Sequence, residues 1–279
     1  MSVFVAGVMG WPVSHSLSPR LHGFWLRAYG ISGRYDALAV QPENLTASLR
    51  ALPQQGMRGV NLTVPHKEAA MKIVDSLDDT ARRIGAINLV TVTDEGKLHG
   101  SNTDAYGFGE NLTAGGFSGG HSALLLGAGG ASRAIIVALI DKGFGDIRIA
   151  NRTIERAQKL AQEFTTPQCR ITAVTWDEIP AAMRETDLLV NATSLGMRGQ
   201  PPLEIALDTL PVSATVTDIV YAPLETALLQ QARQRGHRAI DGLGMLLHQA
   251  RPAFAAFFGR DPEVTPELRA YLLADRQET

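Results

Sequence analysis

Residues 124–156 constrain the fold of this 279-residue chain more than any other segment. A short apolar run at residues 124–126 meets the glycine-rich sequence GAGGAS at residues 127–132. An apolar helical stretch and a second strand-like run at residues 147–150 follow. A strand, a glycine turn, a helix and a second strand within about thirty residues are typical of a βαβ unit. The segment therefore predicts a unit of this kind, with the glycine turn between its first strand and its helix.

The glycine turn has the composition of a phosphate-binding loop. Gly127 suits a tight turn, and Gly129 lets the backbone approach a pyrophosphate, while N–H groups near residues 130–132 can hold phosphate oxygens. The G-x-G-x-x-G pattern is incomplete, because Ser132 stands at its third glycine position. Such a pattern alone is weak, so the strand–turn–helix context carries the prediction against a purely structural glycine turn.

The end of the second strand indicates which dinucleotide would bind. In βαβ units an acidic residue there binds the ribose 2′-hydroxyl of NAD, whereas an arginine accommodates the 2′-phosphate of NADP. Here the sequence reads Asn151, Arg152, Thr153, with Arg156 after them and no acidic residue before Glu155. Guanidinium groups bind phosphate through paired, charge-assisted hydrogen bonds. The pattern favours NADP, and the alternative is that the arginines are merely solvated.

Composition excludes several classes of protein. Hydrophobic residues make up 45%, charged residues 19%, and the net charge is −2, so neither disorder nor nucleic-acid binding is indicated. The single Cys169 excludes an intramolecular disulfide, and the scattered histidines give no metal-binding spacing. Without an apolar run of about 18 residues or a signal peptide, we expect no membrane contact and a soluble cytoplasmic protein. The oligomeric state cannot be read from the sequence, and a homodimer is left open.

The chain before Asp104 combines expected strands with polar loop residues. Residues 3–8, 35–40 and 59–64 predict strands, and residues 86–92 with 97–101 predict a hairpin. A helix is expected after Pro19 with Ser18 as its N-cap, although Ser16 and Ser18 would equally suit a polyhydroxylated ligand. A second helix is expected to begin near residues 66–68.

Two features of the third expected strand suggest a binding site. Asn61 and Thr63 would share one face, and polar side chains are costly to bury without partners. Lys67 follows the carboxyl end of this strand, where ligands gather in open α/β sheets. A lysine in a first helical turn opposes the helix dipole, so a functional reason competes with simple solvation.

From about residue 105 onward, helices alternate with strands. We expect helices at residues 105–112, 154–164, 226–235 and 266–274, and a long apolar helix that carries Gln249. Strands are expected at residues 170–174, 187–193, 215–220 and 237–240. This alternation predicts a parallel, doubly wound sheet. Asp104, which also suits an N-cap, marks the expected passage between two domains.

Short motifs along the whole chain identify a family. In order, these motifs are SHSLSP at residues 14–19, NLTVPHKE at 61–68, NTD at 102–104, NRTIER at 151–156 and DGLGM at 241–245. With them the chain resembles the shikimate dehydrogenases over nearly its full length. The resemblance implies an α/β fold with an N-terminal substrate domain at residues 1–104 and a Rossmann-type NADP-binding domain at 105–240. It also implies C-terminal helices at 241–279 that return to the first domain.

The resemblance also implies an activity, which is the NADP-dependent interconversion of 3-dehydroshikimate and shikimate on the route to chorismate and the aromatic amino acids. Lys67 would be the acid/base and Asp104 would assist it. The implied substrate-binding residues are Ser16, Ser18, Asn61, Thr63, Asn88, Tyr221 and Gln249. The implied cofactor-binding residues are Gly127, Gly129, Gly130, Ala131, Asn151, Arg152, Thr153, Arg156, Thr193, Gly242 and Met245, with Gly196 on the nicotinamide side.

Alternative functions stay open at this point. The nearest are oxidation of quinate or of an aminated shikimate by an enzyme of the same superfamily, although serine at both positions 16 and 18 favours shikimate. A non-catalytic NADP-binding regulatory protein is a different class, and the retention of Lys67 and Asp104 argues against it. We interpret His15 and His66 as loop and helix-start residues, because neither has a visible catalytic partner.

Overall fold

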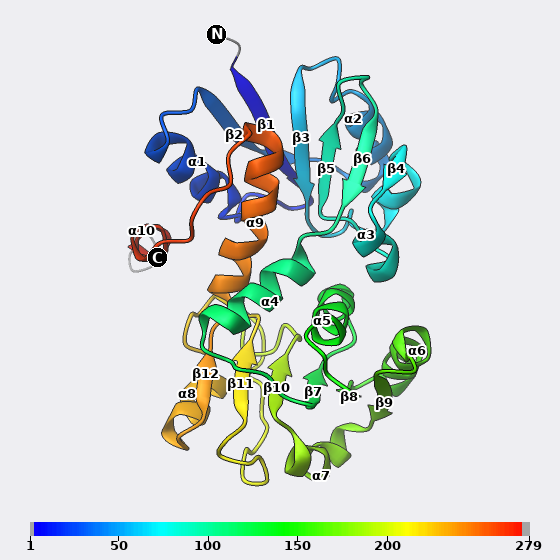
Figure 1. Ribbon diagram of the computed structural model, residues 1–279, viewed down its shortest axis with the longest axis vertical. Coiled ribbons are helices and arrows are strands. Elements are labelled where there is room, and N and C mark those ends of the chain that lie inside the picture. Colours follow the sequence, from blue (N-terminus) through cyan, green and yellow to red (C-terminus); the bar gives the residue numbers. More distant parts are fainter. Residues whose placement is uncertain (1–2, 275–279) are drawn as a thin grey trace. The chain divides into compact units, whose positions relative to one another are not determined.

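The computed structural model describes residues 3–274, in which helices and strands form two compact units (Figure 1). The first unit combines the chain up to Thr103 with the chain from Leu247 onward, and the second unit is Asp104–Leu246. The sequence suggested boundaries after residues 104 and 240, and the two units divide after residues 103 and 246. The predicted fold class, α/β with a Rossmann-type domain, is confirmed by the two sheets described next.

The first unit is built on a mixed sheet. Its strands are β1 (Phe4–Gly10), β2 (Gly33–Ala39), β3 (Met57–Leu62), β4 (Ser76–Leu77), β5 (Leu89–Val92) and β6 (Leu98–Ser101). They lie in the order β2-β1-β3-β5-β6-β4. β1 is parallel to β2 and β3, whereas β5 is antiparallel to both β3 and β6. The predicted hairpin is therefore confirmed as β5 and β6.

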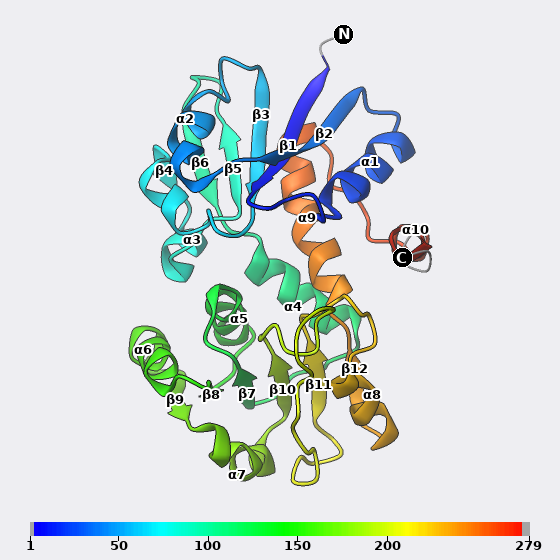
Figure 2. The same cartoon turned by 180° about the vertical axis from the view of Figure 1, so that it is seen from behind.

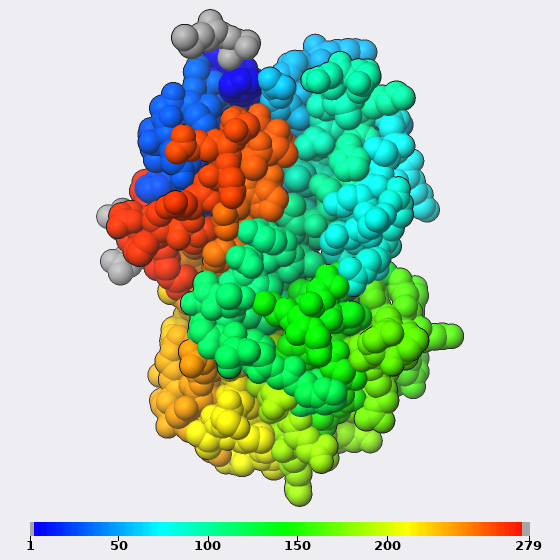
Figure 3. Space-filling model, viewed as in Figure 1, coloured from blue at the N-terminus to red at the C-terminus, as the bar shows by residue number. Residues whose placement is uncertain are grey.

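Helices from both ends of the chain complete the first unit. They are α1 (Ser18–Ala28), α2 (Leu45–Arg50), α3 (Asp79–Ile84), α9 (Leu243–Phe258) and α10 (Pro266–Ala274), with short 3₁₀ turns at Pro42–Asn44 and Ala69–Lys72. Only the part of α9 from Leu247 onward belongs to the first unit. Figure 3 shows the blue N-terminal segment beside the orange and red C-terminal segment. The Trp25 indole donates to the Glu263 carbonyl at 2.9 Å, and its ring packs on Phe254 at 5.3 Å. The first unit therefore depends on residues from both ends of the sequence.

The second unit is built on an all-parallel sheet. Its strands are β7 (Ser122–Leu126), β8 (Asp146–Ala150), β9 (Arg170–Val174), β10 (Leu188–Asn191), β11 (Thr215–Asp218) and β12 (Arg238–Ile240). Their order is β12-β11-β10-β7-β8-β9, and every neighbouring pair is parallel (Figure 1, Figure 2). The order reverses between β7 and β10. In open α/β sheets ligands bind at such a switch point, outside the carboxyl ends of the strands.

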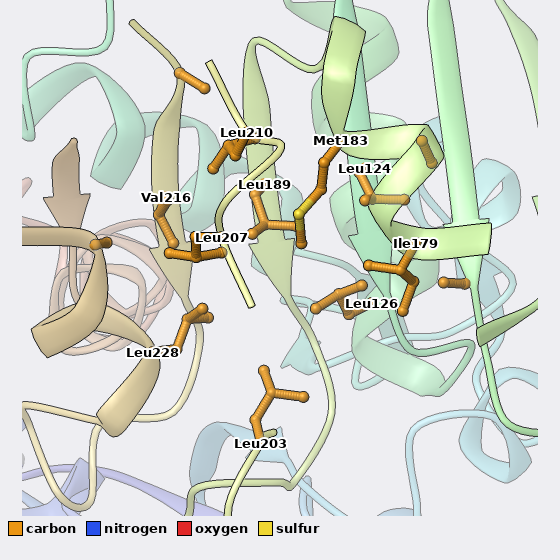
Figure 4. Packing of buried hydrophobic residues seen from close by; sticks show 14 of the residues in the cluster. Leu124, Leu126, Ile179, Met183, Leu189, Leu203, Leu207, Leu210, Val216 and Leu228 are labelled. Carbon is orange, nitrogen blue, oxygen red and sulfur yellow. The ribbon is translucent and has the colours of Figure 1, made fainter. Parts of the chain in front are cut away.

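Apolar side chains cover both faces of this sheet. The helices are α4 (Asp104–Ala114), α5 (Gly130–Asp141), α6 (Ile154–Phe164), α7 (Ile179–Ala182) and α8 (Ala227–Gln234), with 3₁₀ turns at Trp176–Glu178 and Met183–Glu185. Figure 4 shows Leu124 and Leu126 packed with Ile179, Leu189 and Leu228 on one face. Because strand side chains alternate, the fully buried Leu125 points to the opposite face, which must also be covered.

Candidate functional site

The predicted glycine turn lies between β7 and α5, at the switch point of the second sheet. Gly127 has φ +104, and a Cβ there would lie 3.0 Å from Cγ2 of Thr193. Glycine is therefore required both by backbone conformation and by the neighbouring loop. At Gly129 and Gly130, by contrast, a Cβ would meet no atom of the described chain within 4 Å. These two glycines present open backbone, which lets a bound phosphate approach closely.

Ser132 shapes this turn at the position where the dinucleotide pattern has its third glycine. Its hydroxyl is fully buried, donates to the Gly127 carbonyl at 2.9 Å and accepts from the Gly129 N–H at 3.2 Å. The Ser132 N–H bonds to the Gly129 carbonyl at 3.1 Å. The Ser132 N–H therefore has an acceptor within the turn, although the sequence counts it among the N–H groups near residues 130–132 that can hold phosphate oxygens. The N–H groups of Gly130 and Ala131 lie in the first turn, where helices lack intrahelical acceptors.

Residues from four strand ends line one cavity of about 220 Å³ beside this turn. The predicted residues among them are Gly127, Gly129, Asn151, Arg152, Arg156 and Thr193, and the others are Ala128, Trp176, Ala192, Ser194 and Leu195. The cavity therefore brings together the glycine turn, the end of β8 and the loop after β10. The other predicted cofactor residues, namely Gly130, Ala131, Thr153, Gly242 and Met245, are not among its lining residues.

The end of β8 is tied to the glycine turn by Asn151. Its side-chain oxygen accepts from the Ala128 N–H at 3.2 Å, and its amide group donates to the Thr153 carbonyl at 2.8 Å. Thr153 is the N-cap residue of α6, and its carbonyl also accepts from the Arg156 N–H at 3.1 Å. Arg152 and Arg156 are both exposed at the cavity. The turn thus presents two cations next to open glycine backbone, and this combination fits a phosphorylated dinucleotide.

A buried carboxylate organises the loops that follow β10 and β11. Asp218 is 1% exposed and accepts from the Asn191 amide at 2.9 Å, the Val220 N–H at 2.9 Å and the Thr226 hydroxyl at 2.8 Å. Asn191 in turn accepts from both the N–H and the hydroxyl of Thr193, at 3.0 and 2.7 Å. Burial raises the pKa of Asp218 above its ordinary value, while these three hydrogen bonds oppose the rise. The network fixes Thr193 and the segment that leads to Tyr221.

Gly242 and Met245 belong to the segment that follows β12. A Cβ at Gly242 would lie 2.3 Å from the Ile219 carbonyl oxygen and 2.8 Å from that of Asp218. Close backbone packing against the end of β11 therefore explains this glycine, whatever it contributes to ligand binding. Met245 and Tyr221 are half-buried.

In the first unit, the predicted substrate residues form a buried polar network. The Asn61 amide donates to the Asn88 carbonyl at 3.0 Å. The Asn88 side-chain oxygen accepts from the Thr103 N–H at 2.8 Å, and its amide donates to the Thr103 hydroxyl at 3.0 Å and to Gln249 at 3.4 Å. Gln249 also accepts from the Thr103 hydroxyl at 3.4 Å. The structure thus brings three of the predicted residues together, 188 positions apart in sequence (249 − 61), and adds Thr103 to them.

Tyr35 extends this network, and sequence reasoning missed it. Its hydroxyl donates to the Asn61 side-chain oxygen at 2.7 Å and also forms a hydrogen bond with Ser18. Burial raises the pKa of Tyr35 well above its ordinary value. The Tyr35 ring stacks on His22, with 3.9 Å between the ring centroids and an interplanar angle of 5°. This stacking fixes the ring and therefore the position of its hydroxyl. Two predicted substrate residues, Ser18 and Asn61, are therefore oriented by one buried phenol.

The predicted capping role of Ser18 is wrong. The N-cap position of α1 is held by Leu17, which has helical backbone angles and no capping side-chain bond, and Ser18 is the first helical residue. Ser16 performs part of the role instead, because its hydroxyl accepts from the Ser18 N–H at 3.3 Å. Ser18 is thereby left to bond with Tyr35 through its side chain. Ser16 is half-buried, and the neighbouring His15 is exposed.

Lys67 lies on a turn rather than in the predicted helix. β3 ends at Leu62, so Thr63 is not in the strand as expected, and the His66 N–H bonds back to the Thr63 carbonyl at 2.9 Å. The Lys67 carbonyl accepts from the Ile87 N–H at 2.9 Å, which removes it from helical bonding. The buried His66 ring contacts the Val40 carbonyl at 2.8 Å, as a structural residue. Lys67 is half-buried on this anchored turn.

Asp104 is the first residue of α4 and belongs to the second unit. Within residues 3–274, no group of three or more His, Cys, Asp or Glu side chains is placed to hold a metal ion. No helix in that same range is long and apolar enough to span a membrane.

A Rossmann sheet with a glycine turn at its switch point, joined to an α/β unit with a buried polar network, is typical of a dinucleotide-dependent oxidoreductase. The family model of the shikimate dehydrogenase substrate-binding domain matches residues 8–90, and that of shikimate/quinate 5-dehydrogenase matches residues 114–197. The chain belongs to the shikimate dehydrogenase family, as the motifs indicated. The predicted enzyme class and the predicted cofactor, NADP, are confirmed by the relatives described next.

Curated relatives match nearly the whole chain. The NADP-dependent shikimate dehydrogenase of Paramagnetospirillum magneticum is 54% identical over 97% of this chain and 98% of its own length. That of Rhodospirillum rubrum is also 54% identical, over 96% of each chain. Among solved structures, shikimate dehydrogenase from Thermus thermophilus in complex with NADP(H) and shikimate has a TM-score of 0.85 and 39% identity, covering 99% of this chain and 100% of its own. Quinate dehydrogenase from Corynebacterium glutamicum with NAD has a TM-score of 0.91 and 30% identity, covering 98% and 99%.

Proposed function

We propose that this chain interconverts 3-dehydroshikimate and shikimate with NADP, and that the residues described above perform the roles predicted for them. The observation that carries the cofactor assignment is the cavity at which Arg152 and Arg156 stand beside the open backbone of Gly129. The substrate assignment is supported by the buried amide and hydroxyl network in the first unit. A polyhydroxylated acid offers the donors and acceptors that such groups require.

In the proposed reaction, bound NADP supplies or takes up the hydride. Lys67 donates a proton to the substrate oxygen as the ketone is reduced, and its positive charge stabilises the developing alkoxide. In the opposite direction the neutral amine accepts that proton. The bonds from Ile87 to the Lys67 carbonyl and from His66 to Thr63 hold the backbone of this turn, so that the Lys67 side chain starts from a fixed position. Asp104 assists as an acceptor for a substrate hydroxyl.

The remaining roles concern binding. The residues that hold the carboxylate and hydroxyl groups of the substrate are Ser16, Ser18, Asn61, Thr63, Asn88, Gln249 and Tyr221. Asn61 also donates to the Asn88 carbonyl. Thr193, Gly242 and Met245 bind the nicotinamide half of NADP. Gly130 and Ala131 donate their N–H groups to the pyrophosphate, and Asn151, Arg152, Thr153 and Arg156 bind the adenosine ribose with its 2′-phosphate.

Replacement of Lys67 tests the catalytic proposal. We expect Lys67→Ala to lower kcat for shikimate oxidation by about 10²- to 10⁴-fold, because a positioned acid/base contributes a factor of this size. The Kd for NADPH should remain near that of the parent. Lys72→Ala is a matched control, since Lys72 is an exposed lysine in the same segment. Turnover by Lys67→Ala within a few-fold of the Lys72→Ala value would contradict the proposal.

Quinate is the second candidate substrate, and a specific observation supports it. The quinate dehydrogenase structure superimposes with a TM-score of 0.91, against 0.85 for the shikimate complex. Initial rates with shikimate and quinate, each with NADP and NAD, separate the two functions. We expect the highest kcat/KM for shikimate with NADP. A higher kcat/KM for quinate, or for NAD, would replace the corresponding part of the proposal.

A further inference from the structure

Trp176 is the one large aromatic side chain among the residues that line the cavity of the second unit. It lies in the 3₁₀ turn Trp176–Glu178 directly after β9. β8 and β9 are parallel neighbours in which Ala150 is paired with Val174. Arg152 and Trp176 each follow this pair by two residues, and both line the cavity. Adjacent strands are about 4.8 Å apart, so the two segments that carry these side chains leave the sheet side by side.

The backbone at Trp176 is held rigidly. Glu178 accepts hydrogen bonds from the N–H and the hydroxyl of Thr175, at 2.7 and 2.9 Å. The Glu178 N–H returns to the Thr175 carbonyl at 3.2 Å, which closes the turn around Trp176. A turn fixed in this way presents its side chain in one direction before any ligand arrives.

The indole of Trp176 has one packed side and one side at the cavity. It packs against the hydrophobic cluster of Figure 4, which contains Ile179 and Leu126, yet it remains half-buried and lines the cavity. Core packing explains only the part of the Trp176 indole that contacts the hydrophobic cluster. The exposed part of the indole lines the cavity together with Arg152 and Arg156.

We propose that Trp176 is the stacking platform for the adenine ring of NADP, an inference that rests on the proposed cofactor function. The adenine and the 2′-phosphate are attached to the same ribose, so the groups that bind them must be neighbours. Arg152 and Arg156 supply the phosphate site, and Trp176 is the aromatic surface beside them. Base–aromatic stacking is favourable and needs no hydrogen-bond pattern.

This assignment separates the contribution of Trp176 from that of the arginines. NADP and NAD carry the same adenine, so loss of the platform should weaken both cofactors by the same factor. Loss of an arginine that binds the 2′-phosphate should weaken NADP selectively. The ratio of the two affinities therefore distinguishes stacking from charge recognition.

The test uses adenosine 2′,5′-bisphosphate, which contains the adenine and the 2′-phosphate but no nicotinamide. We expect Trp176→Ala to weaken its binding by about 5- to 100-fold, measured by calorimetry, because stacking on an aromatic side chain contributes a factor of this order. Trp176→Phe, which keeps a ring, should lose much less. Nicotinamide mononucleotide should bind both variants as it binds the parent.

Tryptophan fluorescence gives a readout that a purely structural role would not move. The other tryptophans, Trp11 and Trp25, lie in the first unit. Adenosine 2′,5′-bisphosphate should quench the emission of the parent and of Trp11→Phe, but not that of Trp176→Phe. Persistent quenching in Trp176→Phe, or unchanged affinity in Trp176→Ala, would overturn the platform. Neither measurement involves shikimate, so failure of the proposed turnover would be seen separately, in the rate assay.

Discussion

His22 provides a prediction whose size can be worked out from its surroundings. The imidazole is 1% exposed, lies between the rings of Tyr35 and Phe254, and within the described residues its Nδ1 has no hydrogen-bond partner. Burial lowers the pKa of His22 from 6.5 to about 3. Between these two values the unfolded chain binds a proton at this residue that the folded chain does not bind. Folding stability contributed by neutral His22 is therefore present above pH 6.5 and is lost as the pH falls toward 3.

The magnitude follows from the pH interval. From pH 7 down to pH 4.5 this one residue costs about 2.6 kcal/mol, because each pH unit well below the unfolded pKa is worth about 1.36 kcal/mol. His22→Phe keeps an aromatic ring in the stack. Between pH 7 and pH 4.5 we expect its unfolding free energy to fall less than that of the parent, and the difference should be about this amount. His15→Phe is the matched control, since His15 is exposed and its replacement should leave the acid sensitivity of the parent.

Urea unfolding at both pH values measures this difference. A Trp176→Phe background leaves only Trp11 and Trp25, so the fluorescence then reports the first unit, which contains His22. The informative quantity is the change in unfolding free energy between the two pH values, compared across variants, because any effect of the substitution at neutral pH cancels. If His22→Phe and the parent lose equal stability on acidification, the argument from burial is refuted.

Further predictions concern ligand binding in each unit. Arg152→Ala should raise the KM for NADPH by about 10- to 100-fold and that for NADH far less, since it removes charge-assisted bonds to the 2′-phosphate; equal losses in steady-state assays would contradict the phosphate role. Tyr35→Phe should reduce the unfolding free energy by about 1–3 kcal/mol, because Asn61 loses its buried donor, and should raise the KM for shikimate while the Kd for NADPH stays constant. If the KM for shikimate is unchanged in Tyr35→Phe, Tyr35 contributes only to packing and not to substrate binding. Asp218→Asn should lower kcat/KM by about 10- to 100-fold, because an amide cannot accept all three hydrogen bonds and the Thr193 loop shifts; near-parental kinetics would show that the loop positions itself.

The sequence predicted best where local patterns decide the structure. The helix at residues 154–164 and the strand at 170–174 have the predicted bounds, because apolar periodicity and flanking turn residues mark both elements. The glycine turn was found for the same reason. The conformation of this turn depends on a few consecutive residues, so it can be recognised from the sequence itself.

Predictions failed where a distant hydrogen bond decides the structure. The helix expected from residue 66 is reduced to a turn and the 3₁₀ turn Ala69–Lys72, because the Ile87 N–H takes the Lys67 carbonyl, and no local pattern reveals that bond. Ser18 is not an N-cap because Leu17 has helical backbone angles, and Tyr35 provides its side chain with another partner. Trp176 was missed because only the pairing of β8 with β9 brings its segment next to the segment that carries Arg152. Sites assembled from separate strands require the pairing of those strands to be known first.

Because the first unit is discontinuous in sequence, the order of synthesis affects when each unit can fold. Its core needs Phe254, and its polar network needs Gln249, yet both are synthesised after all of the second unit. The second unit is continuous in sequence, so it can complete its sheet while the earlier half of the first unit still waits for these partners. A chain truncated after residue 246 should therefore already hold a nucleotide while it lacks a finished pocket for the acid.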